Sequence, residues 1–311
     1  MKNQNAVVVG GVAILAGMTG ASAQELSPLF KIGSVDVRPH AAYKVIYDDN
    51  VFLEHKKNNV IGPNNNPGRD HDFIHTITPG VRLNAGDASA RETAYMNADY
   101  EAGIQKFTNH KGSDALDHNA HVELGTRLNH LKISLDQTFQ LATAADVRNQ
   151  PALGRVQHKT WNTKADFVYD ISEKTRASLE TDQSIADYSG AMTDSVDRQA
   201  HLFLDYQVLP KVSMGLGGGA GYLQAEGNSL VGHNPNSIYW DGLARLNWAA
   251  TEKVNLSVKG GVQNRHVQEI GFGDDLGLIF RAAADWKVTE RTMVSVSGAR
   301  ETRASNSIGT S

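Results

Sequence analysis

Residues 160–171 read TWNTKADFVYDI, and their side chains alternate between two kinds. The odd positions carry Trp, Thr, Ala, Phe, Tyr and Ile, whereas the even positions carry mostly Asn, Lys or Asp. Successive side chains of a β-strand point to opposite faces of its sheet. An alternation with period two therefore predicts a strand with one apolar face and one polar face.

The same alternation recurs along the chain, at residues 131–141, 199–208, 254–263 and 278–287. These runs are roughly 10 to 14 residues long, whereas a typical soluble strand has about 5 to 6 residues. A tilted strand that crosses a membrane needs about 9 to 11 residues. Their length favours strands that span a bilayer.

The breaks between the runs are of two kinds, which alternate. Short turns are expected at 86–89, 129–130, 172–175, 209–212, 251–254 and 289–292, and long polar loops at 54–70, 108–114, 144–155, 189–194, 227–236 and 268–275. The repeat of about 40 residues also fits a propeller blade, but blades have short strands. Short turns on one rim and long loops on the other are typical of outer-membrane barrels. We predict an all-β fold, a transmembrane antiparallel up-and-down β-barrel.

Thirteen strands are expected, near residues 35–53, 72–85, 91–107, 117–129, 131–143, 157–171, 175–188, 196–208, 211–225, 238–249, 253–266, 277–288 and 292–303. Bacterial single-chain barrels have even strand numbers. The odd count, and the lack of a closing strand with a terminal aromatic residue, predict a barrel that is truncated at its C-terminus. The alternative is that one strand was divided wrongly.

The N-terminus has the pattern of a secretory signal peptide. Residues 1–5 contain one Lys and no acid, residues 6–20 are apolar, and Ala21 and Ala23 are small residues at the positions that signal peptidase reads. Cleavage is expected between Ala23 and Gln24, which leaves residues 24–311 as the barrel. The alternative is a buried N-terminal helix, which the Gly and Val content disfavours.

Composition excludes several classes of protein. The chain has 30 Lys and Arg against 34 Asp and Glu, a net charge of −4, so it is not expected to bind nucleic acid. It has no cysteine, which excludes disulfide scaffolds, cysteine zinc sites and thiol catalysis. No run of about 18 apolar residues occurs, so no membrane-spanning helix is predicted.

Residues 47–53 (YDDNVFL), followed by DFI at 72–74 and PGVRL at 79–83, resemble the beta-barrel porin family of bacterial outer-membrane proteins associated with exopolysaccharide and capsule gene clusters. The turn at 286–292 and GARE at 298–301 are similar to the same family. The resemblance implies a pore or scaffold in the Gram-negative outer membrane, possible polysaccharide cargo and no catalytic residues. It also implies outer-membrane lipid, lipopolysaccharide and the barrel-assembly machinery as partners.

Asp48, Asp49 and Asn50 are expected at the outer rim, where their oxygens could bind Ca²⁺ or the cations of lipopolysaccharide. The alternative is a solvated strand end whose side chains satisfy turn backbone groups. Elsewhere no metal site is expected. His71 and His75 share a strand face but stand about 13 Å apart, and His118 with His121 is the only other dense histidine pair.

No cofactor or enzymatic activity is expected either. The glycine-rich run at 215–221 lacks the Lys-Ser/Thr of a phosphate loop and is expected to allow barrel curvature and close packing. No G-x-S-x-G occurs. A membrane lipid hydrolase would need a Ser–His pair that no spacing singles out.

Charges within a bilayer zone are tolerable toward a wet lumen or in paired networks. The polar faces of the predicted strands carry His201 and fifteen charged residues that are expected to line a pore: Asp99, Glu101, Glu123, Arg127, Asp136, Lys164, Asp166, Asp170, Glu180, Asp182, Asp205, Arg245, Lys259, Arg281 and Asp285. Acids lead, which suggests a mild cation preference. The predicted function is a porin-like passage, with exopolysaccharide as the expected cargo. The alternative is a non-conducting structural or adhesive barrel that binds a surface ligand through its long outer loops.

Overall fold

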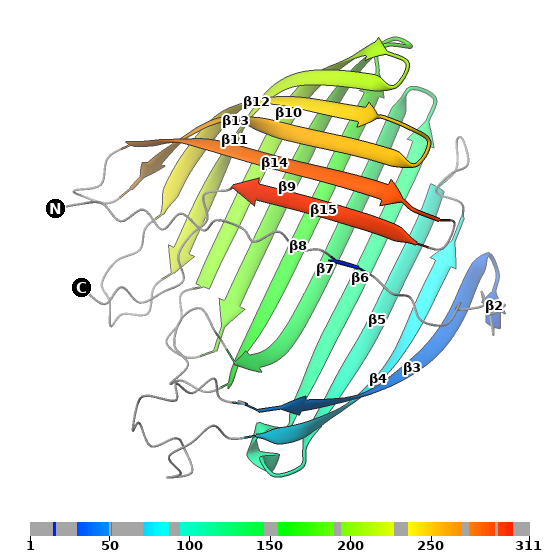
Figure 1. The fold of residues 1–311 in the computed structure, drawn as a ribbon, viewed down its shortest axis with the longest axis vertical. Helices are drawn as coiled ribbons and strands as arrows, with labels where there is room; N and C mark the ends of the chain where they lie inside the picture. The colour runs from blue at the N-terminus through cyan, green and yellow to red at the C-terminus, as the bar shows by residue number, and fades with distance from the viewer. Residues whose placement is uncertain are drawn as a thin grey trace.

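The chain folds into one antiparallel β-sheet in which neighbours in sequence are neighbours in space (Figure 1). The computed structural model describes residues 15–16, 30–49, 51, 71–86, 94–145, 155–189, 194–226, 236–268, 274–289 and 292–300. The sheet has fifteen strands, of which β1 and β2 are short. Among these residues, no helix has the length and apolar character needed to cross a membrane.

The strands are β1 (Leu15–Ala16), β2 (Phe30–Ile32), β3 (Val35–Asp48), β4 (Asp72–Ala85), β5 (Ala94–Phe107), β6 (Ala115–Leu128), β7 (Leu131–Ala145), β8 (Arg155–Asp170), β9 (Thr175–Tyr188), β10 (Asp194–Leu209), β11 (Val212–Glu226), β12 (Ser237–Ala249), β13 (Val254–Val267), β14 (Asp274–Lys287) and β15 (Met293–Arg300). A single 3-10 turn, η1 (Lys111–Ser113), lies between β5 and β6. The all-β, up-and-down architecture predicted from the sequence is confirmed.

The long strands β3 to β15 correspond one to one to the thirteen predicted strands. The bounds of β4 and β9 are those expected, and most other ends differ by one to three residues. The largest difference is at β3, which ends at Asp48 and not near residue 53. Val51 is buried against Ile74 and Phe107, so the chain turns inward there. The sequence did not indicate β1 and β2; a left-handed Gly33 (φ 62°) joins β2 to β3.

Tight connections join the strands along one edge of the sheet. Asn129 and His130 alone separate β6 from β7, and Asn129 adopts the left-handed conformation (φ 48°) that a two-residue hairpin requires. The turn from β8 to β9 closes through a hydrogen bond from Ile171 N to Thr175 O of 3.0 Å. Residues 54–70, 146–154, 190–193, 227–235 and 269–273 of the predicted long loops lie outside the described residues, as do residues 52 and 53 of the first predicted strand.

The sheet curls but does not close. Figure 1 shows β3 and β4 at one side and β14 and β15 at the other, with the remaining strands curving between them. In the described part of the chain, β3 pairs with β4 and β2, and β15 pairs with β14 and β1. β3 and β15 run in the same direction, because an even number of antiparallel steps separates them. They do not pair with each other there, which leaves the gap expected from the odd strand count.

Strand β11 supplies the close packing expected of its glycine run. A Cβ atom at Gly217 would lie 2.3 Å from Phe203 Cδ1, and one at Gly221 would lie 2.2 Å from Tyr239 Cζ. Phe203 and Tyr239 are the largest fully buried side chains among the described residues. They belong to β10 and β12 and lie over the backbone of β11. The packed interior therefore sits where two strands fold their side chains over a third.

Candidate functional site

A cavity of about 1700 Å³ lies on the concave side of the sheet, lined by side chains from β7 to β15. Eleven of the fifteen charged residues predicted to line a pore border it: Asp136, Lys164, Asp166, Asp170, Glu180, Asp182, Asp205, Arg245, Lys259, Arg281 and Asp285. His201 borders it as well. One face of the sheet thus gathers polar residues that are up to about 150 positions apart in the sequence.

The other four predicted residues belong to the same face. Glu123 is paired with Asp136 and Arg127 with Lys132, so both stand beside residues that border the cavity. Asp99 is paired with His121, which contacts Asp136 at 2.6 Å. Glu101 follows two positions after Asp99 and shares its face.

Charges around the cavity are balanced in number, and several of them form ion pairs, among them Arg176 with Asp170 and Arg245 with Asp205. Its lining includes ten acidic and ten basic side chains, so the predicted excess of acid is wrong for this cavity. The fifteen residues predicted to line the pore come mostly from strand interiors. Cations at strand ends and short turns, such as Lys174, Arg176 and Lys211, also border the cavity. The cation preference inferred from that excess loses its basis.

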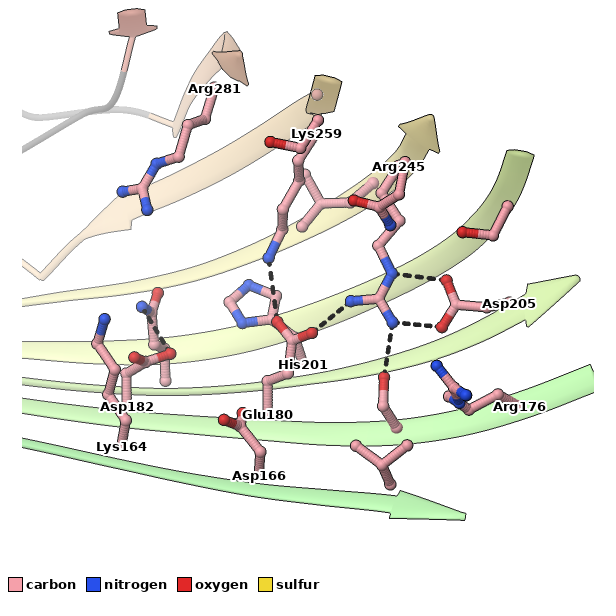
Figure 2. A pocket seen from close by; sticks show the side chains of 18 of the residues that line it. Lys164, Asp166, Arg176, Glu180, Asp182, His201, Asp205, Arg245, Lys259 and Arg281 are labelled. Atoms are coloured by element: carbon pink, nitrogen blue, oxygen red, sulfur yellow. Dashed lines mark hydrogen bonds and ion pairs between the residues drawn. The ribbon is translucent and has the colours of Figure 1, made fainter. Parts of the chain in front are cut away.

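A cationic ladder crosses β12, β13 and β14. Arg245 is paired with Lys259, and Lys259 with Arg281, so the three side chains stand in one row. Facing them on β8 and β9 are Asp166 and Glu180, which are also directly paired. Figure 2 shows Arg245, Lys259 and Arg281 on one set of strands, and Asp166 and Glu180 on another set that also carries Lys164 and Arg176.

Arg245 connects the two sides. Its Nε donates to Asp205 Oδ1 at 2.7 Å, while its two terminal nitrogens contact Asp205 Oδ2 and Glu180 Oε1 (Figure 2). Nη2 also donates to Ser178 Oγ at 2.8 Å. The guanidinium lies 4.0 Å from the centre of the Phe203 ring. A planar fork that meets a carboxylate bidentately and stacks on an aromatic ring is an arrangement that lysine could not reproduce.

Lys259 Nζ reaches Glu180 Oε2 at 3.4 Å, although β13 and β9 are four strands apart. Neighbouring strands are about 4.8 Å apart, so the two backbones are separated by about 19 Å along the sheet. Only a strongly curved sheet brings two such side chains together. The network spans β9 to β13 across β11.

The opposite face of the sheet is apolar and exposed. Large hydrophobic side chains stand on it along most strands, among them Ile77, Leu124, Leu135, Phe167, Leu179, Leu202, Leu204, Leu216, Val258, Val262 and Leu278. They alternate with the cavity-lining residues of the same strands. A surface of this extent on a soluble monomer would be exceptional.

Many exposed aromatic side chains on this face fall at two levels, whereas Tyr100 and Phe280 lie in mid-strand. Near the short turns stand Tyr169, Tyr206, Trp248 and Trp286, each within three residues of a strand end. Near the long loops stand Tyr47, Phe73, Trp161 and Trp240. On β8 and on β12 the two levels are eight residues apart, about 26 Å along the strand. Two aromatic girdles that flank an apolar band are typical of membrane barrels.

Asp72, the first residue of β4, organises the rim on the long-loop side. Its side chain is fully buried and accepts hydrogen bonds from Asn109 N (3.0 Å), His110 N (2.9 Å) and His110 Nδ1 (2.9 Å). Burial opposes its ionisation, but the hydrogen bonds from His110, Asn109 and Phe73 outweigh burial and lower the pKa of Asp72. Asp72 thereby ties β4 to the connection between β5 and β6.

Part of the predicted rim motif, Asp48, Asp49 and Asn50, lies beside the carboxylate of Asp72. Asp48 is paired with Asp72 at the end of β3, and Asp49 follows in a bend. Asn50 lies outside the described residues. Their proposed binding of Ca²⁺ or lipopolysaccharide stays a prediction.

The histidines considered in the sequence have aromatic or carboxylate partners. His75 Nδ1 and Tyr43 Oη are 2.7 Å apart on the apolar face, and the His71 ring lies 6.0 Å from that of Tyr47. His118 contacts Tyr100, whereas His121 contacts Asp136. His118 and His121 are three residues apart in one strand and so point to opposite faces.

Sequence reasoning missed one group. His40, Asp99 and Glu101 offer ligand atoms that all lie within 4.8 Å of one another. His40 is on β3 and the carboxylates are on β5, with β4 between them. No spacing in the sequence indicates this meeting, because it depends on the register of three strands.

No protein-family model matches the chain, and no curated protein matches it in sequence. Among solved structures, the chain is similar to the crystal structure of the COG4313 outer membrane channel from Pseudomonas putida F1. The match has 14% sequence identity, covers 90% of this chain and 99% of that chain, and has a TM-score of 0.41. The fold of this chain is therefore assigned from its own strand pairing.

Proposed function

We propose that the protein is a porin-like β-barrel of the bacterial outer membrane that provides a passage for polar solutes. The observation that carries this proposal is the division of one sheet into an exposed apolar face with two aromatic levels and a charged face around a cavity. A lipid-facing exterior and a polar interior are what a membrane barrel requires. The bacterial outer membrane is where such barrels occur.

The arrangement of the charges around the cavity would determine how a solute interacts with it. The row of Arg245, Lys259 and Arg281 faces Asp166 and Glu180, which creates a field across the lumen. Such a wall offers hydrogen-bond donors on one side and acceptors on the other. Solutes with many hydroxyl groups can satisfy both sides at once, whereas apolar solutes would leave the charges poorly solvated.

Exopolysaccharide is the cargo that we propose, because polyhydroxylated chains suit this wall and because residues 47–53 and 72–83 resemble porins of polysaccharide gene clusters. A second candidate function is a non-conducting structural or adhesive barrel. The contacts of Arg245 and Lys259 with Glu180 favour this non-conducting barrel, because these side chains occupy part of the lumen.

Planar-bilayer conductance of the folded full chain tests the passage. We expect ohmic channels whose cation-to-anion permeability ratio rises in the double variant Lys259→Gln, Arg281→Gln. Lys253→Gln, in the turn before β13, removes a cation outside the cavity lining and should leave the ratio unchanged. Absence of conductance from the folded protein would overturn the passage and favour the non-conducting barrel.

The cargo is tested separately by swelling of liposomes that contain the protein. Neutral oligosaccharides should enter faster than apolar solutes of the same size. Conductance without oligosaccharide entry would retain the channel and reject polysaccharide as its cargo.

A further inference from the structure

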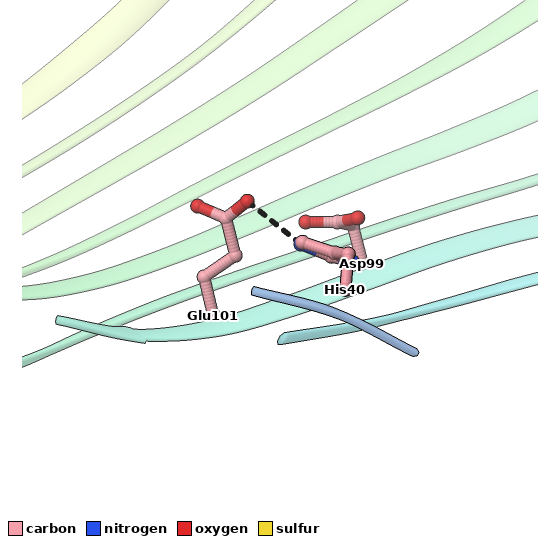
Figure 3. Close-up of side chains that lie close together, drawn as sticks. All are labelled: His40, Asp99 and Glu101. Atoms are coloured by element: carbon pink, nitrogen blue, oxygen red, sulfur yellow. Dashed lines mark hydrogen bonds and ion pairs between the residues drawn. The ribbon is translucent and has the colours of Figure 1, made fainter. Parts of the chain in front are cut away.

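His40, Asp99 and Glu101 converge on the charged face of the sheet, on β3 and β5, away from the Arg245 network (Figure 3). His40 Nε2 and Glu101 Oε1 are 3.0 Å apart, and one carboxylate oxygen of Asp99 lies within 4.8 Å of both ligand atoms. One imidazole and two carboxylates at such distances form a possible ligand set for a metal ion.

Gly80 on β4 makes this convergence possible. It is paired with His40 on one side and with Glu101 on the other, so the three residues form one row across three strands. A Cβ atom at Gly80 would lie 2.5 Å from His40 Nε2. Any other residue there would occupy the space in which the imidazole meets the carboxylates.

The carboxylate of Asp99 is also held by a second contact. Arg82 Nε donates to Asp99 Oδ2 at 3.0 Å, which orients one oxygen and leaves the other for a ligand role. Arg82 is itself paired with Arg38, so cations border the group on one side. Within the described residues, Arg82 is thus a cation that contacts one of the two carboxylates.

The group is partly exposed on the charged face of the sheet. The side chains of His40 and Glu101 are 33% and 36% exposed, and that of Asp99 is 21% exposed. An ion could therefore enter without unfolding the sheet and could keep one position for water. An imidazole with two carboxylates suits Zn²⁺ and similar transition metals, whereas Ca²⁺ and Mg²⁺ prefer ligand sets made of oxygen alone.

We propose that His40, Asp99 and Glu101 bind one divalent transition-metal ion, Zn²⁺ being the best match, and that this ion links β3 to β5 across Gly80. The linked strands lie next to the edge of the sheet where β3 has only the three-residue β2 as its outer neighbour. The ion would add a direct link between β3 and β5, which are otherwise joined through β4. This role is independent of any passage of solutes.

Zn²⁺ binding by the full chain, folded in detergent, tests the proposal. We expect one equivalent to bind in competition with a chromophoric chelator, and Co²⁺ to give the visible absorption of a low-symmetry site. His40→Ala and Glu101→Gln should each weaken Zn²⁺ binding at least tenfold, and Ca²⁺ should not compete. His266→Ala is the matched control, because His266 also contacts a carboxylate, Asp274, at 2.7 Å on distant strands. It should bind Zn²⁺ as the unmodified chain does.

The second readout is stability. Zn²⁺ should raise the temperature at which the folded band is lost on unboiled gels in the unmodified chain and in His266→Ala, but not in Glu101→Gln. The near-isosteric Glu101→Gln keeps the test valid if His40→Ala does not fold. Absence of binding, equal binding by Glu101→Gln, or equal loss in His266→Ala would each overturn the proposal. Conductance is not among the readouts, so failure here leaves the proposed passage untouched.

Discussion

His201 Nε2 lies 3.1 Å from Asp241 Oδ2, although β11 separates the strands that carry them. Gly219 on β11 is paired with both residues. The same arrangement occurs where His40 meets Glu101 over Gly80. In both places a glycine on the middle strand lets side chains from the two flanking strands meet. At Gly219 on β11, the polar side chains on this face therefore come from the flanking strands β10 and β12.

Gly219→Ala should destabilise the protein by about 1 to 3 kcal/mol, because its Cβ would lie 2.2 Å from His201 Cδ2 and 2.6 Å from the backbone oxygen of Ala200. His201 is buried and has little room to move. The measurement is unfolding in denaturant, followed by loss of the folded band. Gly242→Ala is the control, since no atom lies within 4 Å of a Cβ there. Similar losses in both variants would contradict the packing role of Gly219.

Phe167→Arg and Leu278→Arg should each cost about 2 to 4 kcal/mol, because both side chains stand on the apolar face and would carry a charge into lipid. Asn162→Arg and Ser257→Arg place the same charge at the cavity and should be much milder. The yield of heat-modifiable protein from outer membranes is the measurement. Equal damage from the two pairs would show that the faces have been assigned wrongly.

Arg245→Met should destabilise the fold by about 3 kcal/mol, because Asp205 loses its bidentate partner and Glu180 keeps only Lys259. Arg245→Lys should recover only part of the loss, since an ammonium cannot form the fork. Adding Asp205→Asn to Arg245→Met should restore part of the stability by removing the unpaired charge. Unfolding in denaturant measures all three. A double variant that is less stable than Arg245→Met would contradict the pairing of Arg245 with Asp205.

Asp72→Asn should lower stability at neutral pH by about 2 kcal/mol, since a buried carboxylate that accepts several hydrogen bonds is replaced by an amide. The pKa of Asp72 is lowered in the folded protein, so its contribution is complete above the ordinary value of an aspartate, about 3.9. It is lost as the pH falls below that value through the folded pKa. The stability difference between the two chains, measured from pH 7 downward, should shrink only in this acidic range. A difference that is constant with pH would argue against an ionised Asp72.

Of residues 24–311 exported behind a signal peptide, only a minor fraction should be recovered as protease-resistant and heat-modifiable barrel, and the other measurements use this folded fraction. The edges of β3 and β15 pair with only three and two residues of β2 and β1 in the described part of the chain. Unpaired backbone groups in lipid cost several kcal/mol each. The measurement is the protease-resistant fraction in isolated outer membranes. Efficient insertion as a stable barrel would mean that the seam between these strands closes in the membrane.

Much of the fold is local information and could be predicted. The alternation in residues 160–171 places Phe167 and Lys164 on opposite faces, and in the structure they lie on opposite faces of β8. Strand ends were harder, because burial of Val51 decides where β3 stops and its partners Ile74 and Phe107 lie far along the chain. The role of Asp72 could not be predicted, because its partners are the backbone of Asn109 and His110 and the His110 side chain, in a distant connection.

The site itself was predictable as a set of residues and not as a network. Asp205 and Arg245 are 40 residues apart, and their pairing depends on register and on the bend over Gly215. Lys259 and Glu180 are 79 residues apart and meet only because the sheet curves strongly. The balance of charge was misjudged because turn and strand-end cations also border the cavity. Alternation assigns a face, whereas contacts between distant strands require the tertiary structure.

The eight-residue interval from Trp161 to Tyr169, repeated from Trp240 to Trp248, also sets a hydrophobic thickness. Strands tilted by about 40° would reduce 26 Å of strand to about 20 Å along the bilayer normal. That is less than the 30 Å or so of an average hydrocarbon core. The protein should therefore insert more readily into bilayers of short acyl chains than of long ones. Mismatch with thicker membranes would disfavour its insertion there, so acyl-chain length would itself select where this chain can reside.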